Sequence, residues 1–378
     1  MKELKIGVIG VGGRGILASH SHKPDDAVII TAGADPWNVA LDKFAEEYPE
    51  AELFDDYKLL LKSSDIDAVF ICSPDFCHEE QAIAALEAGK AVYLEKPMAI
   101  TIEGCDRILD TAERTGSKLY LGHNMRHFES ILKMKEIIDS GTIGEIKAVW
   151  CRHFVSYGGD AYFKDWHSER KYSTGLLLQK AAHDIDVIHW LSGAYTKSVV
   201  GMGKLDVYDN CSKRTEDDRG DASFHKESWP PLTQKEMSPV IDVEDHNMIL
   251  MQLENGVQVS YVQCHYTPDA WRNYTFIGTK GRIENKGDHG NCSIEVYTNR
   301  TDDYSRPDQV HKLTGESEGH GGADPLIVQR FIDYVRGIAE PNTSPIAARN
   351  AVAVGVAATE SIRGGSCLKL IKKYDERR

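Results

Sequence analysis

The chain has 378 residues, and at roughly 100 to 200 residues per domain this length favours two domains, or three, over a single small module. Its 41% hydrophobic and 27% charged residues are typical of a globular protein and exclude a disordered or fibrous chain. Lys and Arg number 44 against 58 Asp and Glu, a net charge of −14, so the overall field repels nucleic acid and anionic lipid.

From Leu4 to about Tyr120, short β-branched runs alternate with helical stretches. The expected strands are LKIGVIG, VIITAGAD, AVFIC and AVYLEKP, and the expected helices follow Gly15 and cover about 39–48 and 79–88. Such alternation predicts a parallel sheet covered by helices. We therefore expect residues 1–122 to form a doubly wound α/β domain.

After residue 122 the pattern becomes that of an α+β domain, with a long helix expected at 175–191. The expected strands lie at 146–157, 197–205, 244–253, 257–265, 272–278 and 292–297. Gly- and Asn-containing turns between them point to an antiparallel sheet. Residues 123–378 are therefore expected to form a second domain that ends in helices at 325–338 and 346–363.

The stretch 206–239 is poor in apolar residues and rich in charge, Ser and Pro. A long insert of this kind is usually either functional or mobile. We expect it to form a flap or a contact loop.

The sequence gives no sign of a membrane anchor or a metal centre. No apolar run approaches the roughly 18 residues that cross a bilayer, and the N-terminal segment reaches its glycines too early for a signal-peptide core. The eight cysteines contain no C-x-x-C pair, and no H-E-x-x-H spacing occurs. We expect a cytoplasmic protein with reduced thiols, no metal, and no membrane or nucleic-acid partner.

Gly10, Gly12 and Gly15 fit the spacing G-x-G-x-x-G, with Gly13 and Arg14 inside the motif. The motif follows a predicted strand and opens a predicted helix, whose N-terminus would face a pyrophosphate. The alternative is a glycine turn in an unrelated α/β protein. The context favours a dinucleotide-binding loop made of these five residues.

Asp35 lies twenty residues past Gly15, at the end of the next apolar run, where a ribose-binding acid belongs. A carboxylate there accepts hydrogen bonds from a 2′-hydroxyl and repels a 2′-phosphate. Pro36 and Trp37 follow it and offer no arginine for an extra phosphate. The expected cofactor is therefore NAD rather than NADP.

Lys96 and His183 are the catalytic candidates. Lys96 precedes Pro97 at the carboxyl end of a predicted strand, where open α/β folds bind ligands, and its cation can stabilise an alcohol oxygen that loses its proton. His183 shares one helix face with Gln179 and Asp186, and it can take such a proton near neutral pH. The alternatives are an ordinary surface lysine and a structural histidine in the core.

Three weaker polar clusters lie at expected strand ends, namely 244–246, His265–Tyr266 and 271–274. Their aromatic and arginine side chains suit contact with a sugar ring. Exposed strand ends also carry such residues without any ligand.

With GVIGVGGRG, SPDFCHEEQAIAALEAGKAVYLEKP, GHNMRHF and GLLLQKAAHDIDVIHWLSG in this order, the chain resembles the glucose–fructose oxidoreductase/inositol dehydrogenase (Gfo/Idh/MocA) family from Lys5 to about Arg363. The resemblance is weakest in 206–239. It implies a Rossmann domain, then an α/β domain whose open sheet faces a partner subunit in a homodimer or homotetramer. It also implies oxidation or reduction of a sugar, cyclitol or glycoside hydroxyl with tightly held NAD(P).

The resemblance also assigns roles by position, with Lys96 as catalytic lysine and His183 as general acid/base. It places five residues at the nicotinamide half of the cofactor, Ser73, Pro74, His78, Glu95 and Asn124. It places four near the substrate pocket, Arg126, His153, Trp166 and His167. Lys180 and Tyr266 are further substrate candidates. Many members carry aspartate four residues before the histidine, whereas this chain has Gln179 followed by Lys180.

Three functional hypotheses remain. The leading one is an NAD-dependent oxidoreductase acting on a secondary hydroxyl of a carbohydrate or cyclitol. The second is a glycosidase that oxidises C3 transiently, eliminates the aglycone and restores its own NAD. The third is a non-catalytic nucleotide-sensing regulator, which the presence of both Lys96 and His183 disfavours.

Overall fold

The computed structural model describes residues 2–62, 65–215, 223–288, 290–300, 302, 306–315 and 318–374, so that 216–222 of the expected insert lie outside the described residues. The described chain divides into two compact units. The first unit holds the chain up to His127 and Gly322–Val352, and the second holds Phe128–Gly321 and the chain from Ala353 onward.

The first unit is built on a six-stranded parallel sheet with the order β3-β2-β1-β4-β5-β6. The strands are β1 (Leu4–Ile9), β2 (Val28–Ala34), β3 (Glu52–Phe54), β4 (Ala68–Ile71), β5 (Ala91–Leu94) and β6 (Leu119–Leu121). The order reverses between β1 and β4, and a doubly wound sheet binds its ligand outside the strand ends at such a point. The expected Rossmann sheet is confirmed.

Four α-helices accompany these strands, α1 (Asn38–Glu47), α2 (Tyr57–Lys62), α3 (His78–Glu87) and α4 (Ile102–Thr115). Helix α4 begins where the Thr101 hydroxyl accepts the Gly104 N–H, and it ends at Gly116 with φ +66°. The helix expected after Gly15 differs, because it is a 3₁₀ helix, η1, that spans Gly13–Ser21. Its tighter winding starts with the Gly15 N–H donating to the Gly12 carbonyl at 2.6 Å.

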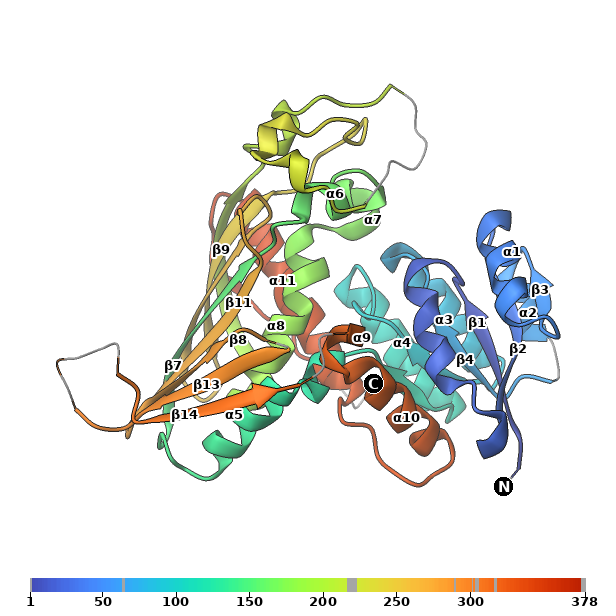
Figure 1. Ribbon diagram of the computed structural model, residues 1–378, viewed down its shortest axis with the longest axis horizontal. Helices are drawn as coiled ribbons and strands as arrows, with labels where there is room; N and C mark the ends of the chain where they lie inside the picture. The colour runs from blue at the N-terminus through green and yellow to red at the C-terminus, as the bar shows by residue number, and fades with distance from the viewer. Residues whose placement is uncertain are drawn as a thin grey trace. The chain divides into compact units, whose positions relative to one another are not determined.

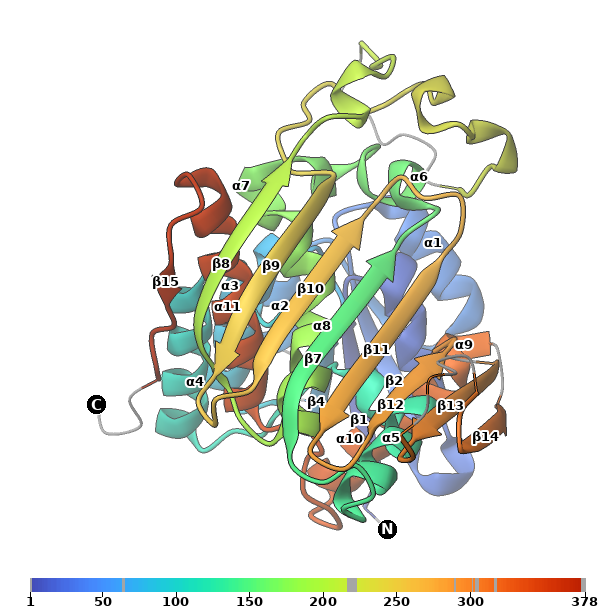
Figure 2. The same ribbon diagram turned by 90° about the vertical axis from the view of Figure 1, so that its left-hand side faces the viewer.

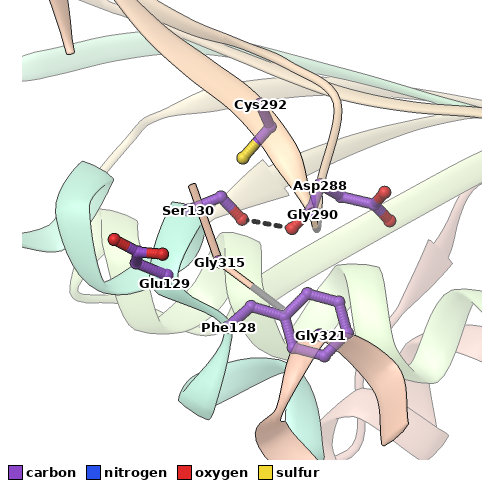
Figure 3. A pocket seen from close by; sticks show the side chains of 8 residues that line it. All are labelled: Phe128, Glu129, Ser130, Asp288, Gly290, Cys292, Gly315 and Gly321. Atoms are coloured by element: carbon purple, nitrogen blue, oxygen red, sulfur yellow. Dashed lines mark hydrogen bonds between the residues drawn. The ribbon is translucent and has the colours of Figure 1, made fainter. Parts of the chain in front are cut away.

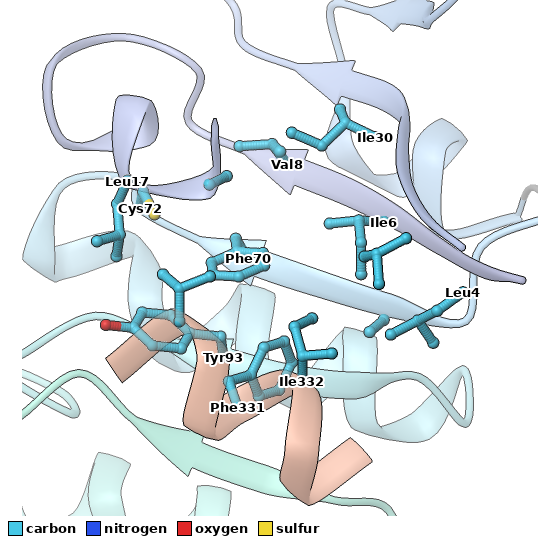
Figure 4. Packing of buried hydrophobic residues seen from close by; sticks show 14 of the residues in the cluster. Leu4, Ile6, Val8, Leu17, Ile30, Phe70, Cys72, Tyr93, Phe331 and Ile332 are labelled. Carbon is cyan, nitrogen blue, oxygen red and sulfur yellow. The ribbon is translucent and has the colours of Figure 1, made fainter. Parts of the chain in front are cut away.

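Helix α10 (Ala323–Val335) completes the core of the first unit (Figure 4). The Phe331 ring lies 5.1 Å from that of Phe70, 5.6 Å from that of Tyr93 and 5.8 Å from that of Tyr120, centroid to centroid. From the sequence, this helix is expected at 325–338 and is assigned to the second domain, residues 123–378. In the structure it packs on the parallel sheet, so the first unit is made from two distant parts of the chain.

The second unit is built on a nine-stranded sheet with the order β14-β13-β12-β11-β7-β10-β9-β8-β15. The strands are β7 (Ile146–Phe154), β8 (Thr196–Lys204), β9 (His246–Leu253), β10 (Gln258–Cys264), β11 (Trp271–Gly278), β12 (Arg282–Lys286), β13 (Asn291–Tyr297), β14 (Gln309–Thr314) and β15 (Lys369–Leu370). Only the pair β7–β10 is parallel among these described strands. The expected mostly antiparallel sheet is confirmed.

Helix α8 (Leu176–Ser192) lies behind this sheet, and the last part of α11 (Pro345–Arg363) packs on α8 (Figures 1 and 2). A Cβ on Gly355 would lie 2.9 Å from Leu178 Cα, so the two helices approach closely. The other helices of this unit are α5 (Glu129–Asp139), α6 (Gly158–Tyr162), α7 (Arg170–Ser173) and α9 (Glu318–Gly321). Within the described chain, no helix is long and apolar enough to span a membrane.

The opposite face of the sheet, which Figure 2 views, has none of the described helices in front of its central strands. Side chains on that face include Trp150, Met202, Met248 and Leu250, which are 41%, 68%, 55% and 61% exposed. Met202 pairs with Met248 across β8 and β9, which places the apolar side chains side by side. The face is thus an apolar surface on an open sheet.

The described part of the insert contains three 3₁₀ turns, η6 (Tyr208–Asn210), η7 (Lys226–Ser228) and η8 (Pro231–Thr233). Its beginning is fixed, because the Asp245 carboxylate accepts the backbone N–H groups of 206–208 at 2.7–3.3 Å. Tyr208 and Met237 are buried in a cluster with Phe163 and Leu176. The two ends of the insert therefore belong to the core of the second unit.

Candidate active site

The glycine motif forms a close-packed turn at the carboxyl end of β1. Gly10 has φ +82°, and a Cβ there would lie 2.6 Å from the Ser73 nitrogen, so only glycine fits. A Cβ on Gly15 would lie 2.3 Å from the Gly10 carbonyl oxygen. A Cβ on Gly13 would meet nothing within 4 Å. The turn is therefore packed on its inner side and open at Gly13, as a backbone cradle for a pyrophosphate requires.

Asp35 directly follows β2 and lies beside this turn. Its Oδ1 accepts the Trp37 N–H at 2.9 Å, and its Oδ2 is 4.0 Å from the position of a Cβ on Gly12. The carboxylate thus lies next to the phosphate cradle, where it can accept hydrogen bonds from a ribose diol. The residues present fit an adenine dinucleotide.

His78 connects the ends of β4 and β5. Its Nε2 lies 2.9 Å from the Ser73 carbonyl oxygen and its Nδ1 lies 2.7 Å from the Pro97 carbonyl oxygen. Burial lowers the pKa of His78, although both carbonyls act to raise it. The ring therefore lies between the segments at Ser73–Pro74 and Lys96–Pro97, and the single N–H of its neutral form can donate to one of the two carbonyl oxygens.

Lys96 is half-buried at the end of β5, and its peptide bond to Pro97 is cis. Its backbone N–H donates to Glu95 Oε2 at 3.0 Å. Because β5 neighbours β4, and β4 neighbours β1, Lys96 lies at the same edge of the sheet as the glycine turn. Lys96 thus follows the carboxyl end of a parallel strand, as the sequence predicts.

Arg14 and Asn124 share a partner that the sequence did not suggest. Arg14 donates to Glu95 and, through both terminal nitrogens, to Asp324; Asn124 Nδ2 also donates to Asp324, at 3.1 Å. Asp324 lies 310 residues beyond Arg14. No local pattern could have linked the two.

His183 and Lys180 lie on the less buried side of α8, whereas Gln179 and Asp186 are buried. The Lys180 ammonium lies 4.4 Å from the ring centroid of Tyr162 and 5.8 Å from that of Tyr157. Such cation–π contacts hold the lysine against an aromatic surface. Asp186 is too buried to act on a substrate directly.

Asp184, next to His183, forms a buried polar centre with three strands. His153 Nδ1 and the Tyr261 hydroxyl both lie 2.9 Å from its Oδ2, and the Tyr274 hydroxyl donates to its Oδ1. Arg272 Nε lies 3.1 Å from Oδ1. Burial opposes the charge of Asp184, but Arg272 and His153 hold its pKa well below the ordinary value. Arg272 and Tyr274, expected at a strand end facing a sugar, therefore point into the core.

His153 is also part of this buried centre. Burial and the neighbouring Arg272 lower the pKa of His153 to about 4. The imidazole is thus neutral at physiological pH. The ring lies 2.9 Å from Asp184 and 3.1 Å from Arg272, so it links β7 to α8.

The substrate candidates Trp166 and His167 stack on each other, with ring centroids 3.7 Å apart. His167 meets Tyr162 at 5.1 Å, and Tyr162 also meets His265 at 5.6 Å. Tyr162 thereby joins these rings to Lys180. Sequence reasoning missed Tyr162, which sits in a short helix, α6, without a motif of its own.

Two other substrate candidates lie elsewhere. Tyr266 packs against His246, at 5.7 Å between centroids. Arg126 is buried in the first unit and donates to the Asn342 carbonyl oxygen at 2.7 Å. In the cluster at 244–246, Glu244 pairs with Arg363 at 2.8 Å.

A small pocket in the second unit contains none of the sequence-predicted residues (Figure 3). It is lined by Phe128, Glu129, Ser130, Asp288, Gly290, Cys292, Gly315 and Gly321. The Ser130 hydroxyl donates to the Asp288 carbonyl oxygen at 2.6 Å. Among the described residues, no three His, Cys, Asp or Glu side chains are grouped to hold a metal ion.

Comparison with known proteins identifies the family. Residues 4–123 match the NAD-binding Rossmann fold of the oxidoreductase family Gfo/Idh/MocA, and residues 135–370 match its C-terminal alpha/beta domain. The Bacillus subtilis protein YteT is 26% identical over 340 residues, covering 78% of this chain and 79% of YteT. Inositol 2-dehydrogenase of Salmonella typhimurium is 28% identical over 291 residues, covering 74% of this chain and 73% of the enzyme.

The same fold occurs in the WlbA dehydrogenase of Bordetella pertussis, solved in complex with NADH and UDP-GlcNAcA. The TM-score is 0.75 and the identity is 20%, over 98% of this chain and 99% of WlbA. Both domain matches agree with the glycine cradle and with the position of Asp35 after β2. The chain belongs to the Gfo/Idh/MocA oxidoreductase family and carries its NAD-binding Rossmann domain.

Proposed function

We propose that this protein is an NAD-dependent dehydrogenase that oxidises a secondary hydroxyl of a sugar, cyclitol or glycoside. The observation that carries the proposal is the placement of Asp35, the glycine cradle and Lys96 along one edge of the parallel sheet. Similarity to inositol 2-dehydrogenase supports a cyclitol or sugar as substrate.

The preference for NAD over NADP rests on Asp35. Its carboxylate lies beside Gly12, with Oδ2 4.0 Å from the position of a Cβ there. A 2′-phosphate there would meet a negative charge, and the neighbouring Trp37 offers no cation.

In the proposed reaction, the substrate loses one C–H and one O–H bond and gains a C=O double bond. Bound oxidised nicotinamide supplies the acceptor for the hydrogen and the electron pair of the C–H bond. The imidazole of His183 takes the hydroxyl proton. The ammonium of Lys96 stabilises the negative charge on the oxygen as that proton leaves. The same residues serve reduction in the opposite direction.

Substrate binding is assigned to the second unit. Lys180 offers an ammonium over the faces of Tyr157 and Tyr162, and Trp166 with His167 offers a stacked aromatic pair. Aromatic faces and fixed hydrogen-bond donors are what a ring with many hydroxyl groups requires. Gln179 is neutral, so it cannot stabilise a charged imidazole as an aspartate would.

We propose in addition that the protein is a homo-oligomer whose subunits meet through the open sheet face. The exposed Trp150, Met202, Met248 and Leu250 support this assignment, because an apolar surface of this kind is typical of an interface.

The decisive experiment incubates the purified protein with NAD and a panel of sugars and cyclitols while absorbance at 340 nm is followed. We expect NADH formation with at least one compound, and loss of at least about a hundredfold in K96A and H183A. The control K147A removes an exposed lysine on β7 and should remain active. Release of free sugar from a nitrophenyl glycoside without net NADH would support the glycosidase instead.

A further inference from the structure

Helix α10, far from the glycine-rich loop in the sequence, supplies a carboxylate to this loop. Asp324 lies in the first turn of α10, and its two oxygens accept hydrogen bonds from both terminal nitrogens of Arg14, at 2.7 and 2.9 Å. The Nε of the same guanidinium donates to Glu95 Oε1 at 2.9 Å. Arg14 stands between Gly13 and Gly15, so its side chain joins the loop, the end of β5 and the start of α10.

The positive charge of Arg14 is already balanced within the protein. Burial opposes this charge, but the carboxylates of Glu95 and Asp324 raise the pKa of the guanidinium. One guanidinium faces two carboxylates, so the group as a whole does not attract a pyrophosphate by its charge. The bidentate geometry instead fixes the position of the residue that carries it.

Asp324 also accepts a hydrogen bond from Asn124, which the family resemblance places near the cofactor. Asn124 Nδ2 donates to its Oδ1 at 3.1 Å, and both side chains are buried. A single carboxylate therefore holds Arg14 in the loop after β1 and Asn124 in the segment after β6.

The helix that presents Asp324 is itself fixed at its middle and its end. Phe331 is fully buried against the aromatic rings of Phe70, Tyr93 and Tyr120. At the C-terminal end, Lys118 Nζ donates to the carbonyl oxygens of Tyr334 and Val335 at 2.7 and 2.9 Å. The position of the carboxylate is thus set by the core of the first unit.

We propose that Asp324 is a positioning residue of the dinucleotide site. It holds Arg14 and Asn124, and through Arg14 it keeps the amides of the glycine loop in one arrangement, so that cofactor binding requires no ordering of the loop. The inference deepens the proposed function and rests on the use of NAD by this chain. Asp324 acts through Arg14 and Asn124 and need not touch the cofactor.

The test is a fluorescence titration of the full-length protein with NADH. D324N keeps the shape of the side chain but removes its charge, and we expect the Kd for NADH to rise about tenfold, as for the loss of one charge-assisted hydrogen bond. D324E restores a carboxylate and should recover part of this loss. R14K keeps the positive charge but cannot donate two parallel hydrogen bonds to Asp324, so it should also raise the Kd for NADH. The double variant R14K/D324N should bind NADH no more weakly than the single variant with the higher Kd, because both changes break the same contact.

D106N is the matched control, because Asp106 pairs with the buried Arg349 at 2.8 Å in the same unit. We expect D106N to lower the Tm while the Kd for NADH stays within about twofold of the parent. The inference is overturned if D324N binds NADH as tightly as the parent, or if D106N weakens binding equally. If D324N does not fold, D324E and R14K decide the question by the same titration. If the parent itself binds no NADH, the proposed function fails instead.

Discussion

The Asp184 carboxylate lies 3.1 Å from Nε of Arg272, and the two side chains are 0% and 14% exposed. Helix α8 is thereby tied to β11 at the residue directly after His183. His153 from β7 and Tyr261 from β10 bind the same carboxylate. The orientation of the α8 face that carries His183 is therefore fixed by a charge in the core.

Removing this charge should destabilise the second unit. D184N removes the fully buried carboxylate beside Arg272 and leaves the guanidinium with Asp288, whose Oδ2 lies 3.3 Å from Nη1. The loss of one partner of a buried pair costs about 3–5 kcal/mol. Urea denaturation should show this decrease. D139N, which removes an exposed partner of Lys135 on α5, should change stability little. Equal stability of D184N and the parent would show that Asp184 does not fix α8.

Acid should destabilise the protein before its carboxylates protonate. Burial lowers the pKa of His78 and His265, and burial with nearby arginines lowers those of His127 and His153 to about 4. Unfolded histidines titrate near pH 6.5, so between about pH 6.5 and 4 the unfolded chain takes up protons that the native chain does not. Stability is therefore present above pH 6.5 and is lost as the pH falls towards 4.

The size of this effect can be measured by urea midpoints at pH 7.5 and 5.5. His127 and His153, whose pKa values are lowered to about 4, should each account for about 1.4 kcal/mol of lost stability at pH 5.5. H127N should reduce the difference between the two pH values by that amount, whereas H225N, at an exposed position in the insert, should not. A midpoint that is the same at both pH values would contradict the prediction.

Asp35 should decide between the two nicotinamide cofactors. D35S removes the charge that repels a 2′-phosphate, so we expect the ratio of kcat/KM for NADP to that for NAD to rise at least about tenfold. D42N, at an exposed position on α1, is the control and should leave the ratio unchanged. An unaltered ratio in D35S would mean that another residue sets the preference.

Lys180 should act in substrate binding rather than in cofactor binding. K180M keeps the apolar stem against Tyr162 but removes the ammonium, and we expect KM for the sugar or cyclitol to rise about tenfold with an unchanged Kd for NADH. K171M is the control, because it removes an exposed lysine that lies 4.5 Å from the ring centroid of Tyr172. It should leave KM for the sugar or cyclitol unchanged. A weakened affinity for NADH in K180M would place this lysine in the cofactor site.

The open sheet face should hold subunits together. L250E adds a charge to its centre, and sedimentation velocity should show a smaller species than the parent. L132E introduces the same charge at an exposed leucine of α5 and should keep the parental oligomer. A monomeric parent would refute the proposed assembly.

The sequence could predict those features of the site that depend on neighbours along the chain. The glycine spacing, Asp35 after the second expected strand and Lys96–Pro97 after the fourth all lie at strand ends, and parallel strands bring their carboxyl ends to one edge. Strands such as β14 and β15 were not expected, because β14 is largely exposed and β15 has two residues. Neither offers a buried apolar run.

The alternation of strands and helices, the glycine spacing and the strand-end acid and lysine thus determined the parallel sheet and one edge of the site from local patterns alone. Only the tertiary structure decided which distant side chains meet. Packing of Phe331 on the parallel sheet brings Asp324 to Arg14 across 310 residues, and the register of β11 turns Arg272 inward to Asp184. Such contacts depend on burial and strand register, which the residues adjacent in sequence do not specify.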